Sequence, residues 1–154
     1  MIVIGVTGSR YWRDRKVVED ALDEAAEGHG TVLVRHGMCP PRFANSGRYV
    51  SWGQGLRMEA AGNKGGLLGA DWFADRHAVR RGWRTQQYPA DWAQYRLRAG
   101  VVRNEVMVRD GADLWLAFMH PGSIGTADCV RRAEFMQIPV RRFHEEVLVG
   151  DGEE

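Results

Sequence analysis

The feature that most constrains the fold is a regular alternation of short apolar runs with stretches of helical periodicity. Apolar runs at residues 2–6, 31–34 and 113–118 have the length and composition of buried strands, and shorter strands are expected at 84–88 and 138–140. Segments 14–27, 69–81, 99–109 and 126–136 have the residue spacing and end signals of helices. Parallel strands need crossover helices, so the alternation predicts an α/β fold: a three-layer sandwich around a mostly parallel sheet of about five strands.

The chain length of 154 residues is that of one domain, which we expect to span residues 1–144. Residues 38–66 interrupt the alternation after the second strand, with two prolines, six glycines and no long apolar periodicity. We interpret this segment as a long insertion with one short helix near residues 56–61. Residues 145–154 form an acidic C-terminal tail.

The charge balance bears on the class of partner. The net charge is +1, which argues against a dedicated nucleic-acid surface, although the acidic tail leaves residues 1–144 with +6. Nineteen of the 21 basic residues are arginine, a bias that suits phosphate recognition but that a skewed genomic base composition also produces.

The sequence offers no pattern for a metal, a cofactor or a membrane. Cys39 and Cys129 give no disulfide framework, and the five histidines have no metal-ligand spacing. No apolar run approaches about 18 residues, and the first residues lack the basic region of a signal peptide. We therefore expect a cytoplasmic protein without a resident metal or cofactor.

Two loops rich in glycine and hydroxyl residues follow apolar strands. In a doubly wound sheet of order 3-2-1-4-5 the winding reverses between the strands that precede TGSR (7–10) and HPGSIGT (120–126), so both loops would share one ligand site. Gly8, Ser9 and Arg10 would bind one side of an anion. The other side would be bound by the second loop, through Gly122, Ser123, Gly125 and Thr126. The alternative is that Ser9 and Thr126 only cap helices.

Four further residues are candidates for the same site. Asp71 lies at the start of a helix, where it either caps the helix or binds ribose hydroxyls. Arg103 and Asn104 lie within a half-apolar helix, and either face solvent or point into the site. Trp12 directly follows the first loop and is the candidate for stacking on a base.

Seven blocks of the sequence, taken together, resemble a known family. They are TGSRYW, GLLGADWFADRHA, PADW, AGVVRNEVM, ADLWLAF, PGSIGTADCVRRA and IPV, in that order. Across residues 1–36 and 67–140 the chain is similar to the YspA/cpYpsA-related branch of the SLOG superfamily, which has a Rossmann-like fold and includes LOG-type phosphoribohydrolases. The resemblance implies a nucleotide or nucleotide-derived ligand.

The resemblance also implies roles for individual residues. The hydrolases hold a phosphoribosyl group with a PGGxGTxxE loop, whose final glutamate acts with an arginine of a preceding helix. Pro121, Gly122, Gly125 and Thr126 match that loop, Ser123 replaces its second glycine, and Arg103 matches the arginine, with Asn104 in place of lysine. Cys129 stands at the position of the glutamate, and a thiol cannot do that carboxylate's work.

Three functions remain open at this point. The first is a sensor or sequestering protein that binds a nucleotide without turnover. The second is a LOG-like nucleotide 5'-monophosphate phosphoribohydrolase, an N-glycosidase in which Arg103 and Asp128 are catalytic. The third is an oligomeric interaction module with residues 38–66 as its interface. We also expect a homo-oligomer, a dimer or larger.

Overall fold

The computed structural model describes residues 1–63 and 66–146 of the chain. Residues 64–65 of the expected insertion and residues 147–154 of the expected acidic tail lie outside the described residues. The elements are β1 (Ile2–Gly8), α1 (Arg15–Ala26), β2 (Val32–His36), β3 (Arg42–Phe43), α2 (Trp52–Ala60), β4 (Leu67–Leu68), α3 (Ala70–Arg80), β5 (Arg84–Gln87), α4 (Trp92–Tyr95), the 3₁₀ helix η1 (Arg96–Arg98), α5 (Ala99–Arg109), β6 (Leu114–Met119), α6 (Ile124–Phe135) and β7 (Val140–His144).

The central sheet has five strands in the order β5-β2-β1-β6-β7, and all four pairings are parallel. Numbered among themselves, these strands have the order 3-2-1-4-5 that the sequence interpretation assumed. The winding reverses between β1 and β6, which pair from Ile4 with Leu114 to Gly8 with Phe118. The predicted α/β sandwich around a parallel sheet is confirmed.

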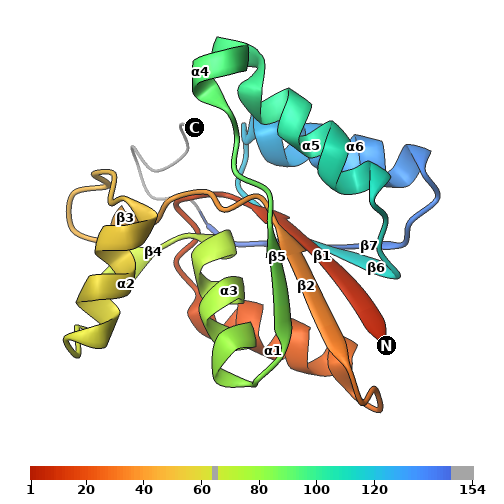
Figure 1. The fold of residues 1–154 in the computed structure, drawn as a ribbon, viewed down its shortest axis with the longest axis horizontal. Coiled ribbons are helices and arrows are strands. Elements are labelled where there is room, and N and C mark those ends of the chain that lie inside the picture. Colours follow the sequence, from red (N-terminus) through yellow and green to blue (C-terminus); the bar gives the residue numbers. More distant parts are fainter. Residues whose placement is uncertain (64–65, 147–154) are drawn as a thin grey trace.

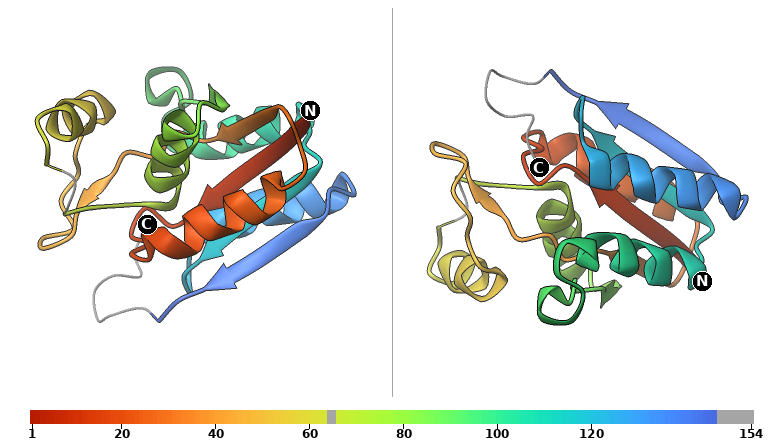
Figure 2. Two further views of the ribbon diagram at one scale, coloured as in Figure 1. Left: turned by 90° about the horizontal axis from the view of Figure 1, so that it is seen from below. Right: turned by 90° about the horizontal axis from the view of Figure 1, so that it is seen from above.

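Helices cover both faces of the sheet. In Figure 1, α1 and α3 lie on one face and α5 and α6 on the other, while α2, β3 and β4 project from one edge of the molecule. The two views of Figure 2 show the same three layers from below and from above. No helix in the described part of the chain is long and apolar enough to cross a membrane.

β1, the central strand, packs closely against a buried ring of β6. A side chain at Gly5 would have its Cβ 2.3 Å from the ring of Trp115, which is fully buried on the neighbouring strand β6. No real Cβ tolerates such a contact, so glycine at this position is what lets the tryptophan ring lie flat against β1. β1 and β6 are thereby held together next to the point where the winding reverses.

The insertion is more ordered than its glycines suggest. β3 and β4 form a two-stranded antiparallel sheet, and α2 begins at Trp52 with Ser51 as its N-cap, whose hydroxyl accepts from the Gln54 N–H at 3.1 Å. The expected short helix near residues 56–61 therefore begins earlier. The ring of Trp52 stacks on buried His36 at the end of β2, so α2 is attached directly to the central sheet.

The last strand differs from the prediction. It was expected at residues 138–140 but covers Val140–His144. Ile138 is instead packed against α6 and β6, and the Pro139 carbonyl accepts from the Trp115 N–H. β7 is an edge strand with exposed polar residues, so it has no continuous apolar run by which the sequence could mark it.

Candidate functional site

A small cavity lies at the carboxyl edge of the sheet, where the winding reverses. Its volume is about 40 Å³. It is bordered by the end of β1, the residues after β2, the first turn of α3, one face of α5 and the start of α6. The lining residues are Thr7, Gly8, Arg10, Gly37, Cys39, Asp71, Arg103, Asn104, Met107, Gly125 and Thr126. Seven of the twelve predicted site residues are among them, from four separate stretches of sequence.

The first glycine-rich loop contributes Gly8 and Arg10, while Ser9 holds the loop in place. The Ser9 N–H donates to the Phe118 carbonyl at 2.9 Å, and the Ser9 carbonyl accepts from the Ala70 N–H at 3.1 Å. Its hydroxyl accepts from the Tyr11 N–H at 3.0 Å, and the residue is fully buried. Ser9 therefore joins β1, β6 and α3, and is not one of the residues that line the cavity.

Trp12 lies in the core, so it offers no ring face for the base stacking that the sequence suggested. Its exposed fraction is 0%, its indole N–H donates to the Asp14 carbonyl, and its ring stacks on His120 and meets Phe118 edge-on. Trp12 directly follows the TGSR loop in sequence, but its ring packs in the core and does not line the cavity.

Asp71 is the most unusual residue of the cavity. The side chain is 3% exposed, and its Oδ2 accepts from the Cys39 N–H at 3.1 Å. Its other oxygen, Oδ1, is buried and has no hydrogen-bond partner among the described residues. The helix α3 has Gly69 at its N-cap and no side-chain cap. The hydrogen bond of Asp71 goes to Cys39 and not to an N–H of α3, so capping is not the role seen, and one buried oxygen of this cavity-lining carboxylate is left without a donor.

Arg103 lines the cavity, and its guanidinium is held by two backbone carbonyls. Nη1 donates to the Gly37 carbonyl and, at 3.4 Å, to the Tyr88 carbonyl. Nε donates to Asn104 Oδ1 at 2.9 Å, and Nη2 lies 3.9 Å from the Cys39 sulfur. These contacts hold a positive charge at the cavity that Asp71 also lines, so Arg103 and Asn104 do not simply face solvent.

The predicted residues of the second loop, HPGSIGT, line two different hollows. Gly125 and Thr126, in the first turn of α6, line the cavity, and the Gly125 carbonyl accepts from Asn104 Nδ2 at 3.2 Å. Gly122 and Ser123 line a neighbouring open hollow instead. Ser123 caps α6 with its backbone only, and its buried hydroxyl has no partner among the described residues. Two of the four residues predicted from this loop, Gly125 and Thr126, therefore line the cavity.

Neither Asp128 nor Cys129, the two positions on which hydrolysis would depend, lines the cavity. Asp128 Oδ2 accepts from Arg132 Nε at 3.0 Å and from Asn104 Nδ2 at 3.1 Å, and the residue lines the groove between α5 and α6. Cys129 is fully buried among Met107, Trp115 and other apolar residues. The predicted catalytic pair is not brought together: Arg103 lines the cavity and Asp128 does not.

Four lining residues were not predicted from the sequence: Thr7, Gly37, Cys39 and Met107. Gly37 had a recognisable signal, since a glycine directly after a strand often marks a close approach. A Cβ there would lie 2.6 Å from Arg103 Nη1. Cys39 had no such signal, because only the course of the insertion brings its N–H to Asp71. Within residues 1–63 and 66–146 no cluster of histidine, cysteine and acidic side chains could hold a metal ion.

Both cysteines are free thiols, and both are expected to be unreactive. Burial raises the pKa of the Cys129 thiol to about 12 and, together with the charge of Asp71, raises that of Cys39 to about 11. The thiolate is the reactive form, so each thiol should react with iodoacetamide at pH 8 at least ~100-fold more slowly than free cysteine. Mass spectrometry of native and urea-unfolded protein measures this, and rapid native labelling of Cys129 would contradict the buried placement.

Comparison with known proteins finds a relative in a bacteriophage. No protein-family model matches the sequence, and no solved structure matches it. The chain is 36% identical over 148 residues to the Gene 61 protein of Mycobacterium phage D29, an alignment that covers 90% of this chain and 93% of the phage protein. The chain belongs to the Gene 61 family. The name of this relative states no activity.

Proposed function

We propose that this Gene 61 family protein binds a nucleotide or a nucleotide-derived ligand at the sheet-edge cavity and holds it without turnover, as a sensor or sequestering protein. The observation that carries the proposal is the buried Oδ1 of Asp71, which has no hydrogen-bond partner among the described residues and belongs to a side chain that lines the same cavity as Arg103. A buried acceptor without a donor costs roughly 1–3 kcal/mol, and a ligand hydroxyl would remove that cost. Neighbouring ribose hydroxyls are donors of the required kind.

The surroundings of Asp71 suit the rest of a nucleotide. Arg10 lines the same cavity, and so do Gly125 and Thr126 in the first turn of α6. A guanidinium and the N–H groups of a helix start both favour a phosphate. The enclosed volume of about 40 Å³ accommodates one small polar group, so the remainder of the ligand would lie on the open side of the two loops. The resemblance to the SLOG superfamily supports the same ligand class.

The chemistry of the cavity favours binding over hydrolysis. At the position of the family glutamate stands Cys129, a buried thiol whose raised pKa of about 12 keeps it protonated at neutral pH. Asp128 is paired with Arg132 and turned toward the groove between α5 and α6. The phosphoribohydrolase alternative therefore lacks the carboxylate that it was expected to use.

A ligand screen followed by product analysis tests the proposal. Nucleoside monophosphates, cyclic nucleotides, NAD and ADP-ribose are compared by thermal shift, where a ligand at 100 times its Kd adds about 2.7 kcal/mol to the free energy of unfolding. Chromatography of the same mixtures detects released base or ribose phosphate. Binding without products supports the proposal, release of a base supports the hydrolase, and the lack of any thermal shift contradicts both.

We further propose that the expected homo-oligomer forms through the groove between α5 and α6. Phe135 at its end is 87% exposed and Met136 is 48% exposed, and both line the groove. Its rim carries both signs of charge, including Glu105 and Arg109, which suits contact with a second copy of the same surface. The insertion is the alternative interface. Among its described residues, Tyr49 is the most exposed large apolar side chain, at 59%, which is less than the 87% of Phe135.

Replacing Phe135 by glutamate should therefore reduce the molar mass in solution from that of an oligomer to that of the monomer. Light scattering coupled to size-exclusion chromatography measures the mass. Leu97→Glu is the matched control, because Leu97 is 94% exposed but is not among the groove residues. A monomeric wild-type protein, or a Phe135→Glu variant that remains oligomeric, would refute this interface.

A further inference from the structure

The insertion carries an exposed surface of aromatic and basic side chains, on a hairpin formed by residues 42–49. Arg42 and Tyr49 face each other across an antiparallel bridge, and the Phe43 N–H donates to the Arg48 carbonyl at 2.9 Å. Figure 1 shows that β3, which belongs to this hairpin, projects from one edge of the molecule together with α2. No residue of the hairpin lines the cavity at Asp71.

Arg42 lies between two tyrosine rings. Its guanidinium carbon is 5.5 Å from the centre of the Tyr11 ring and 5.6 Å from the centre of the Tyr49 ring. Tyr11 belongs to the loop between β1 and α1, so this contact attaches the hairpin to the central sheet. Tyr49 remains 59% exposed, so Arg42 covers only part of its ring. An exposed ring that a cation holds in place offers a surface on which a flat group can stack.

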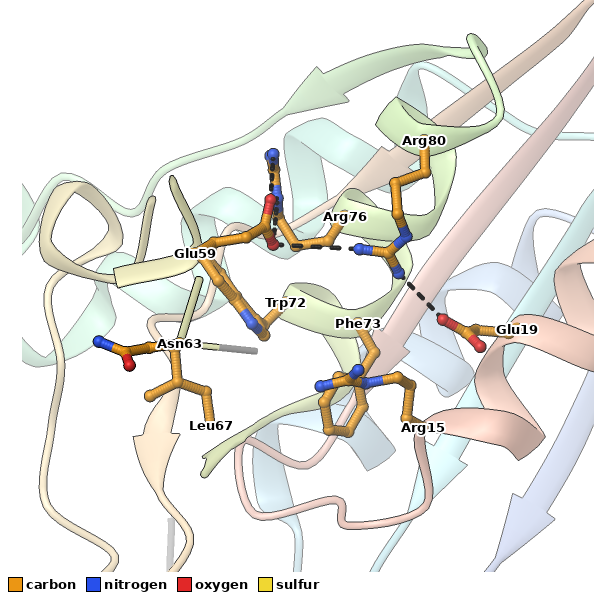
Figure 3. Close-up of a pocket in the computed structure, with 9 residues that line it drawn as sticks. All are labelled: Arg15, Glu19, Glu59, Asn63, Leu67, Trp72, Phe73, Arg76 and Arg80. Atoms are coloured by element: carbon orange, nitrogen blue, oxygen red, sulfur yellow. Dashed lines mark hydrogen bonds and ion pairs between the residues drawn. The ribbon is translucent and has the colours of Figure 1, made fainter. Parts of the chain in front are cut away.

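The insertion is basic, although the net charge of the whole chain is only +1. Residues 38–66 contain four basic residues and one acidic residue, Glu59. Figure 3 shows Glu59 turned toward Arg76 and Arg80 of α3, and its carboxylate accepts three hydrogen bonds from Arg76 at 2.9–3.1 Å. α3 therefore neutralises the acidic group of the insertion. The overall charge, which argued against a nucleic-acid surface, averages over this local excess of positive charge.

Two arginines of the insertion are available to bind an anion. Arg48 on the hairpin and Arg57 on α2 are both exposed, and neither side chain has a hydrogen bond or an ion pair within residues 1–63 and 66–146. A guanidinium in this state can bind a phosphate without first giving up a carboxylate. Arg48 directly precedes Tyr49 in the chain, so a phosphate next to a base stacked on Tyr49 lies within reach of its long side chain.

We propose that this surface, formed by Tyr49 with Arg42, Arg48 and Arg57, binds single-stranded nucleic acid. An unpaired base stacks on Tyr49, and the phosphates beside it contact the arginines. Aromatic stacking and basic side chains along the backbone are the two components by which proteins bind single strands with little regard to sequence. A duplex lacks unpaired bases for the ring, and an acidic protein segment would use the charge but not the ring. This surface is separate from the nucleotide site, and either can exist without the other.

Fluorescence anisotropy with a short, fluorescein-labelled oligothymidylate tests this proposal. At about 50 mM NaCl we expect a Kd below about 100 μM. The logarithm of the affinity should fall with the logarithm of the salt concentration with a slope of about −2, the value for three phosphate contacts on a single strand. The same oligonucleotide in a duplex should bind at least about fivefold more weakly, because its bases are already stacked. An oligoglutamate peptide, which represents an acidic protein segment, should also bind at least about fivefold more weakly.

Matched variants separate the ring from the charge. Tyr49→Ala should weaken binding of the single strand at least about fivefold, whereas Tyr49→Phe keeps the ring and should stay within about twofold of the wild type. Arg48→Gln should reduce the steepness of the salt dependence by about 0.7. The controls are Tyr95→Ala, which removes a tyrosine 40% exposed outside the insertion, and Arg84→Gln, which removes an exposed arginine of β5. Both should bind within about twofold of the wild type.

Four results would overturn the proposal. The single strand could fail to bind below about 100 μM at about 50 mM NaCl, or the duplex or the oligoglutamate could bind as tightly as the single strand. Tyr49→Ala could bind like the wild type, or the two control variants could lose as much affinity as Tyr49→Ala and Arg48→Gln. A changed molar mass of Tyr49→Ala in light scattering, with unchanged oligonucleotide binding, would assign the ring to a contact between copies of the chain instead.

Discussion

Replacing Asp71 by asparagine should weaken nucleotide binding about 100-fold, or ~2.7 kcal/mol, while the fold stays intact. The buried Oδ1, which has no partner among the described residues, is the acceptor that a ligand hydroxyl would use. An amide at this position either offers a weaker neutral acceptor or turns its NH₂ group toward the ligand. A hydrogen bond to a charged group contributes about 1.5–3 kcal/mol, which sets the expected size of the loss.

The effect of Asp71→Asn on stability should be small. The side-chain oxygen that accepts from the Cys39 N–H can be kept by the amide, so the attachment of the insertion survives. The substitution also removes a buried charge, which offsets the favourable effect of a carboxylate in the first turn of α3. We expect the free energy of unfolding, measured by urea titration, to change by less than about 1 kcal/mol.

Asp128→Asn is the matched control for this experiment. It makes the same chemical change in a carboxylate near the same α5 residues, but on the side of the groove between α5 and α6. Binding of the nucleotide with the largest thermal shift should stay within about twofold of the wild type. Equal losses in the two variants would show that Asp71 acts only through the general charge of the region. Unchanged binding in Asp71→Asn would contradict the proposed site.

The three central strands could be predicted because they carry their signal locally, whereas the strand order was assumed from the doubly wound pattern. β1, β2 and β6 are apolar runs bounded by turns, and buried parallel strands need no alternation of polar and apolar residues. β7 could not be placed from its own residues, since an edge strand exposes alternate side chains and reads as polar. Its position is fixed instead by pairing with β6.

The insertion was expected to be mostly loop because of its glycines, one of which has a packing role. A Cβ at Gly55 would lie 2.8 Å from the ring of Trp72, so glycine here lets α2 approach α3. The start of α2 did carry a signal, because Ser51 and Gln54 have the spacing of a capping box. The sequence interpretation gave more weight to the glycine content of this segment than to the capping box, and so placed the helix too late.

The part of the candidate site that could be predicted is the meeting of the two glycine-rich loops. The strand order alone brings the two glycine-rich loops to one edge of the sheet, and Arg10, Gly125 and Thr126 line the cavity as expected. The direction of individual side chains could not be predicted in the same way. Trp12 faces the core and Asp128 faces the groove between α5 and α6, because each is turned by packing against residues distant in sequence.

Replacing Arg103 by alanine should cost about 2–4 kcal/mol in the free energy of unfolding and also weaken nucleotide binding. The guanidinium satisfies the Gly37 carbonyl at the end of β2 and the Tyr88 carbonyl after β5. Leaving such acceptors unpaired costs roughly 1–3 kcal/mol, so the variant loses stability at the very edge where the ligand binds. Urea titration measures the loss of stability, and Arg98→Ala is the control, since Arg98 is exposed and directly precedes the same helix but is not a groove residue.

Arg103→Lys separates the two roles of this side chain. A lysine keeps the positive charge but cannot reproduce the fork of donors that reaches Gly37, Tyr88 and Asn104 together. We therefore expect Arg103→Lys to recover less than half of the stability that Arg103→Ala loses. It should recover a larger share of the lost nucleotide affinity. If Arg103→Ala unfolds at the same urea concentration as Arg98→Ala, the guanidinium does not hold the edge of the sheet. The cavity would then have to keep its shape through Ser9 and the attachment of the insertion to Asp71.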